Sequence, residues 1–159
     1  MLLERSDTVR RIGAVISSVL LLLPFILAAQ DAPNASTDKA RVVVCRCRQF
    51  EGGGSRPSIY CNETDVARVQ AGRYVALGLA PGKYSFRSVA QQSQIELDLK
   101  PGQEYYIRLD IVVGELFGHV RLTLVQPEQG IGEVKQMKPA DAGMVKDKRF
   151  LAADFVPTR

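Results

Sequence analysis

The sequence predicts an all-β domain, an antiparallel β-sandwich of about seven strands, preceded by an N-terminal signal helix and followed by a short mixed tail. Three observations support this fold class. Apolar and polar residues alternate with the period of two that strands require, and no helical period occurs before Pro127. A Pro-Gly pair also occurs twice, 20 residues apart, in "LAPGKYSF" and "LKPGQEYYI".

The first 29 residues have the order of residues found in an export signal. Three arginines precede an uncharged apolar run at residues 12–29, which ends in the small residues Ala28 and Ala29. We therefore expect cleavage before Asp31 and a periplasmic or secreted product. An uncleaved signal anchor in the inner membrane, formed by residues 12–29, is the alternative, because about 17–25 apolar residues are enough to span a bilayer.

The remaining chain divides into three parts. Small polar residues at 30–40 predict a flexible leader, residues 41–126 the β-sandwich domain, and residues 127–159 a tail that is richer in Lys and Ala. We expect the tail to hold one short helix before Pro139, with residues 133–137 as its best turn. Apolar residues near its end, Phe150 and Phe155 among them, are expected to pack over an open sheet edge.

The strand prediction is strongest in "YYIRLDIVV". Its odd-numbered residues from Tyr105 to Ile111 are apolar and are expected to face the core, whereas its even-numbered residues from Tyr106 to Asp110 are expected to face water. Similar alternation occurs in "QIELDL" and "HVRLTLV". The other predicted strands are "RVVVCRCRQF", "RYVALGL" and "KYSFRSV", with weaker ones at 58–61 and 66–69.

Both Pro-Gly pairs are predicted to be turns between strands. Pro81 and Pro101 fix φ at the second turn position, and Gly82 and Gly102 accept the positive φ that a type II turn requires at the third. The four residues are therefore assigned a structural role in chain reversal.

The glycine and aromatic pattern around these turns resembles a known family. An apolar strand leads to Gly72-Arg73-Tyr74, then to the Leu79–Gly82 turn, and Gly102 precedes the paired tyrosines 105 and 106. Over residues 42–125 this pattern is similar to the bacterial secreted proteins classed as domain of unknown function 2846. The resemblance implies a transthyretin-like or carboxypeptidase-regulatory-like β-sandwich and supplies no catalytic residues. Many members look like lipoproteins, and this chain lacks their lipid-bearing Cys.

Three cysteines allow three interpretations. Cys45 and Cys47 share one strand face, and residues two apart in a strand are not readily bridged to each other, so Cys61 is the expected disulfide partner of one of them. Such a bridge would add about 3 kcal/mol in the loop-entropy model. A zinc-like set completed by His119, and plain buried thiols, are the alternatives.

The charges give no support to a nucleic-acid partner, and none is expected. The formal net charge is +4, which is too low for phosphate binding to dominate. Residues 41–87 carry eight Lys or Arg against three acids, and residues 95–115 carry five acids against two bases. Cross-strand pairing explains this distribution. The alternative is an anionic partner on the face that carries Arg46 and Arg48.

The sequence predicts no catalysis and no metal or cofactor. It contains a single histidine, His119, and no recognisable nucleophile or acid-base pair. We expect an exported binding or structural module of the cell envelope, whose partner is an envelope protein or a glycan. An accessory domain of an envelope enzyme system and a weak carbohydrate-binding module are the alternatives. The absence of Trp disfavours the latter, because sugar rings stack on aromatic side chains.

Overall fold

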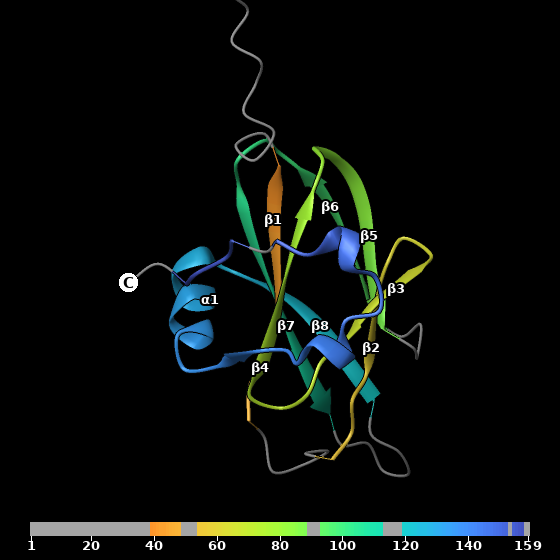
Figure 1. Cartoon of the computed structure of the whole chain (residues 1–159), viewed down its shortest axis with the longest axis vertical. Helices are drawn as coiled ribbons and strands as arrows, with labels where there is room; N and C mark the ends of the chain where they lie inside the picture. The colour runs from red at the N-terminus through yellow and green to blue at the C-terminus, as the bar shows by residue number, and fades with distance from the viewer. Residues whose placement is uncertain (1–38, 49–53, 89–92, 113–118, 153, 158–159) are drawn as a thin grey trace, which may run out of the picture. The chain divides into compact units, whose positions relative to one another are not determined.

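The structure, a computed structural model, describes residues 39–48, 54–88, 93–112, 119–152 and 154–157. The strands within these residues are β1 (Ala40–Arg46), β2 (Ser58–Cys61), β3 (Thr64–Arg68), β4 (Arg73–Leu79), β5 (Gly82–Ser88), β6 (Gln94–Leu99), β7 (Glu104–Val112), β8 (His119–Val125) and β9 (Lys138–Pro139). They form a five-stranded sheet in the order β8-β7-β1-β4-β9 and a four-stranded sheet in the order β3-β2-β5-β6 (Figure 1). The predicted all-β class is confirmed.

The two sheets share one hydrophobic core. Alternate residues of β1, Val42 and Val44, are fully buried there, together with Ile59 of β2 and Phe86 of β5. These side chains belong to both sheets, so the core lies between them. Burying such apolar surface is the main favourable contribution to folding, at about 25 cal/mol per Å².

One detail of the predicted topology is wrong, because not every strand pair is antiparallel. β1 pairs with β7 in parallel, and the two-residue β9 pairs with β4 in parallel. The reason lies in the connections. β7 enters the five-stranded sheet from β6 of the other sheet and not through a hairpin from β1, so no tight turn forces the two neighbours to run in opposite directions.

Each Pro-Gly pair lies where the chain passes from one sheet to the other. Pro81 separates β4 from β5, and Pro101 and Gly102 separate β6 from β7. Gly102 has φ 68°, and the amide of Gln103 donates to the carbonyl of Lys100 at 3.3 Å, as in a type II turn. Gly82 also has positive φ, but at 144° it is already the first residue of β5 and does not have type II geometry.

The backbone at these glycines leads to a stability prediction. Gly82→Val and Gly102→Val should each lower the free energy of unfolding by roughly 1–3 kcal/mol, because a side chain at positive φ is strained. Pro81→Ala should cost less, about 0.4–1 kcal/mol, since it mainly frees the unfolded chain. Urea denaturation would measure the loss of unfolding free energy in each of the three variants and so check their order. If both glycine variants were as stable as the parent protein and Pro81→Ala were strongly destabilised, the strain assigned to Gly82 and Gly102 would be contradicted.

The outer face of the five-stranded sheet is covered by helix α1 (Pro127–Val134). A second apolar cluster lies beneath this helix and combines Val43, Tyr74 and Tyr106 from the sheet with Val134 from the helix. Two expectations are corrected here. The expected short helix before Pro139 is present, but it begins at Pro127 and shares only Glu133 and Val134 with the predicted turn at 133–137. Tyr106 is only 1% exposed where a water-facing residue was expected.

The tail runs past β3, an edge strand of the four-stranded sheet, and past β4 of the five-stranded sheet. Figure 1 shows it as the blue segment that crosses β4. After β9 it forms a bridge between Val145 and Ala67 of β3, then returns to β4 through a bridge between Leu151 and Leu77. Phe150 packs against the core between the sheets. The expectation that the tail packs over open strand edges is therefore confirmed.

Phe155 completes the covering of the outer face. Its ring meets Tyr74 edge-on at a centroid distance of 5.6 Å, and it packs against the cluster beneath α1. Val156, the next residue, is 75% exposed, so not every apolar side chain at the end of the tail packs against the domain.

The predicted signal or anchor at 1–29 lies outside the described residues. Among the residues that the structure describes, no helix combines the length and the hydropathy needed to cross a bilayer. The export prediction therefore stays a prediction.

Candidate functional site

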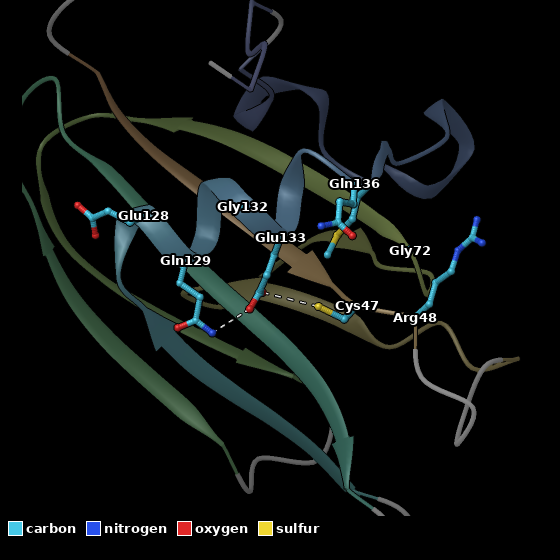
Figure 2. A pocket seen from close by; sticks show the side chains of 9 residues that line it. Cys47, Arg48, Gly72, Glu128, Gln129, Gly132, Glu133 and Gln136 are labelled. Carbon is cyan, nitrogen blue, oxygen red and sulfur yellow. Dashed lines mark hydrogen bonds between the residues drawn. The ribbon is translucent and has the colours of Figure 1, made fainter. Parts of the chain in front are cut away.

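A hollow of about 470 Å³ lies between the end of β1, the turn at Gly72 and helix α1. Figure 2 shows its lining from close by. The side chains come from segments far apart in the sequence, because β1 passes beneath the helix. The lining residues are Cys47, Arg48, Gly72, Glu128, Gln129, Gly132, Glu133, Gln136 and Met137.

Glu133 is the central polar group of this site, and its two carboxylate oxygens have different partners. Oε1 accepts hydrogen bonds from Arg108 Nη1 at 3.1 Å and from Gln129 Nε2 at 2.9 Å. Oε2 accepts from the thiols of Cys45 at 3.8 Å and Cys47 at 3.7 Å. The dashed lines in Figure 2 mark the contacts with Gln129 and Cys47. The carboxylate is therefore held by groups from α1, β1 and β7.

The two thiols beside Glu133 are held in the protonated form. Burial raises the pKa of Cys45 to about 12, and the negative charge of Glu133 acts in the same direction. Burial and Glu133 also raise the pKa of Cys47. Charged partners on β7 complete the surroundings, since Arg108 Nε donates to Asp110 at 3.0 Å. Neither thiol is activated as a nucleophile at neutral pH.

Arg48 lies at the rim of the hollow and is exposed. Its side chain crosses the backbone at Gly72, where a Cβ would come within 2.8 Å of Arg48 Nε, and Gly72 has φ 73°. A glycine is required there for both reasons. Among the described residues, Arg48 has no hydrogen-bond or ion-pair partner, so its guanidinium can meet a ligand.

The structure does not contain the disulfide that the sequence predicted. Cys45, Cys47 and Cys61 are all free thiols. Cys61 lies in the core between the sheets, whereas Cys45 lies in the cluster beneath α1. The two are on opposite sides of the five-stranded sheet, because Cys45 has the outward parity of β1. The described residues contain no cluster of three or more Cys, His, Asp or Glu able to hold a metal ion.

The alternative of an anionic partner on the face that carries Arg46 and Arg48 is contradicted for Arg46, whereas Arg48 is exposed. Arg46 is fully buried, and its Nη1 donates to the carbonyl of Ser55 at 2.7 Å. The cause is that both faces of β1 are covered, which strand alternation alone does not reveal. Charge pairing does occur, since Arg41 pairs with Glu104 of the neighbouring β7, and Arg87 pairs with Glu63 at 2.9 Å.

Sequence reasoning did not find the main polar residues of the hollow. Gln129, Glu133 and Gln136 were assigned only to the tail, and the predicted turn began at Glu133. Their spacing of four and three residues is the signal that could have placed them on one helical face. The remaining candidate, His119, is the first residue of β8 and pairs with Val112 of β7.

The buried thiols lead to a prediction about stability at alkaline pH. Burial raises the pKa of Cys61 to about 11, from an ordinary value of 9.0. Between these values the unfolded chain loses its proton first, so the free energy of unfolding should fall with pH by about 1.4 kcal/mol per pH unit for this group. The stabilisation is complete below about pH 9.

Urea denaturation of the reduced protein between about pH 8 and pH 11 would measure this slope. Cys61→Ala should be less stable at neutral pH, because it leaves a small cavity. Its stability should nevertheless fall less steeply with pH than that of the parent protein. Equal slopes for the two proteins would contradict the assignment to Cys61.

Comparison with known proteins gives one match. Residues 36–119 match the family described as "Protein of unknown function (DUF2846)". No curated protein and no solved structure matches the chain. The matched residues extend from before β1 to the first residue of β8. Helix α1 and the tail, which supply most of the wall of the hollow, lie beyond them.

Proposed function

The chain belongs to the DUF2846 family of proteins of unknown function, and from its own residues we propose that it is an exported, non-catalytic binding module of the cell envelope, built as a transthyretin-like β-sandwich. Export is supported by the basic, apolar and small-residue order of residues 1–29. The sandwich type is supported by two sheets that share one core.

The observation that carries the binding function is the hollow beside α1. Its size of about 470 Å³ is within the range of small-molecule sites. The lining offers the exposed guanidinium of Arg48, and the amide side chains of Gln129 and Gln136 are exposed as well. A guanidinium binds a carboxylate with two parallel hydrogen bonds. A small carboxylate, or the C-terminus of a peptide, is therefore the ligand chemistry that this site favours.

The state of the ionisable groups supports binding in preference to catalysis. The Glu133 carboxylate accepts hydrogen bonds from four side chains and is therefore not a free base. The thiols beside it have raised pKa values, because they are buried next to this carboxylate. A pre-formed arrangement of this kind can select a ligand without changing it.

NMR titration of the full chain would test the proposal. Succinate and N-acetyl-dialanine serve as probes, with N-acetyl-dialanine amide as the matched ligand without a carboxylate. We expect the first two to shift the amide resonances of residues around the hollow, and the amide to have no effect. Arg48→Gln should abolish the shifts, whereas Arg68→Gln, an exposed position on β3 in the other sheet, should retain them.

Two results would overturn the binding proposal. One is the absence of shifts around the hollow with either carboxylate, and the other is equal binding by the Arg48 and Arg68 variants. The export half of the proposal has its own test, which is the mass of the N-terminal peptide of protein from the native host. A new N-terminus near Asp31 is expected, and full-length chain in the cytosol would exclude export.

A further inference from the structure

We propose that Cys45 and Cys47 form a reversible disulfide with each other, which makes the wall of the hollow a site of thiol–disulfide exchange. This inference is independent of the proposed ligand. It rests on the position of two thiols around a single carboxylate oxygen. It also replaces Cys61 as the expected partner in any bridge.

The first step is the convergence of the two side chains. Both Sγ atoms contact Glu133 Oε2, at 3.8 Å for Cys45 and 3.7 Å for Cys47. Because both sulfur atoms contact the same oxygen, the distance between them is no greater than the sum of these two distances. Both sulfur atoms lie on the same side of the sheet. Cys61 is separated from them by the sheet itself, because it belongs to the core on the other face.

The second step concerns the backbone between the two cysteines. Residues two apart in an extended strand have Cα atoms about 6.6 Å apart, which is near the upper limit for a disulfide. The pairing of β1 with β7 ends at Cys45, and its pairing with β4 ends at Arg46. Cys47 is therefore outside both ladders. Its backbone can turn toward Cys45 without breaking strand pairing.

The third step is the different access of the two thiols. Cys47 is half-buried and lines the hollow, whereas Cys45 is fully buried behind it. An incoming disulfide therefore reaches Cys47 first. The Cys47 thiol first loses its proton to solvent, because its raised pKa keeps it protonated at neutral pH. The resulting thiolate attacks one sulfur of the donor, so that the donor S–S bond breaks as the bond between Cys47 and that half of the donor forms. The other half leaves as a thiolate and takes up a proton.

Cys45 completes the exchange. Its thiol loses a proton to solvent, and the thiolate attacks Cys47 Sγ and expels the second half of the donor as a thiolate, which takes up a proton from solvent. Two protein thiols are thereby oxidised to one disulfide, and one donor disulfide is reduced to two thiols. A short and strained ring of this kind is easily reduced again.

Oxidation would also change the hollow. In the reduced protein Glu133 Oε2 is occupied by two S–H donors, and a disulfide removes both of them. The carboxylate oxygen then faces the hollow without these donors. The redox state of the pair would thus set how many hydrogen-bond acceptors the site offers to a ligand.

Treatment of the reduced full chain with oxidised glutathione would test the proposal. After acid quenching, free thiols are alkylated and the protein is digested with trypsin, which cleaves after Arg46 between the two cysteines. We expect a pair of peptides, 42–46 and 47–48, that is joined until a reductant is added. Cys61 should be alkylated completely. The matched control Cys61→Ala should form the same bridge.

Cys47→Ser and Cys45→Ser should form no bridge, and their circular dichroism would show whether they fold. A bridge to Cys61, glutathione retained on Cys47, or three free thiols in the treated parent protein would each overturn the proposal. These outcomes involve no ligand, so they are distinct from failure of the binding proposal.

Glu133→Gln supplies a readout that a purely structural role would not produce. The charged groups facing the thiols are Glu133 from α1 and Arg108 and Asp110 from β7. Removing the carboxylate charge should lower both thiol pKa values, so the pH profile of bridge formation should move to lower pH. The rate at pH 8 should rise by up to about tenfold. An unchanged profile would contradict the role assigned to Glu133.

Discussion

Gly130→Ala should destabilise the protein by about 2–3 kcal/mol, although alanine is the better helix former. A Cβ at Gly130 would overlap the ring of Tyr106 and would come within 2.6 Å of its Cδ1. The ring cannot move away easily, because Tyr106 is 1% exposed and its hydroxyl donates to Glu104 at 2.8 Å. The helix must shift outward, which opens the cluster beneath it. Urea denaturation would measure the loss.

The same helix provides a matched control. Gly132 is two residues further along α1, and a Cβ there would meet no atom within 4 Å. Gly132→Ala should therefore stabilise the protein by about 0.5–1 kcal/mol, the usual gain in an exposed helix. Opposite signs for the two substitutions are the expected result. A harmless Gly130→Ala would show that α1 does not pack on Tyr106 in solution.

These two glycines also explain why the sequence placed the best turn of the helix too far along the chain, at residues 133–137. The segment "PEQGIGEV" contains two residues of low helix propensity, so local preference argues against a helix there. Its stability comes from packing, with Val134 buried and Gly130 allowing close contact with the sheet. A residue that weakens the isolated helix is thus the one that lets it dock. Propensity read along the chain cannot show this.

The strands were easier to predict because their signal is local. The alternation in "YYIRLDIVV" corresponds to β7, and Leu109 is fully buried on the expected face. Alternation shows which residues share a face, but it does not show whether the other face is covered. Tyr106 and Arg46 were therefore predicted to be exposed to solvent, but both are buried. The hollow could not be predicted for the same reason: it forms only where α1 lies over the end of β1.

Ending the chain at Gln126 should abolish folding, which is the largest effect we expect. Removal of α1 and the tail uncovers Val43, Tyr74 and Tyr106, which now lie beneath them. Exposing three such side chains costs about 1.5–3 kcal/mol each, a sum comparable to the total stability of a domain, about 5–15 kcal/mol. The truncated chain should be insoluble, or should bind a dye that reports exposed apolar surface and lack a cooperative unfolding transition.

Two further truncations would locate the effect. Ending the chain at Pro157 keeps every described contact and should leave the stability unchanged. Ending it at Pro139 keeps α1 and β9 but removes the contact between Phe155 and Tyr74. The latter should fold with a lower unfolding midpoint. The family match ends at residue 119, the first residue of β8, so its boundary does not mark the end of the folding unit. A soluble, cooperatively unfolding chain that ends at Gln126 would contradict this conclusion, because the outer face of the sheet would then be stable in water without its cover.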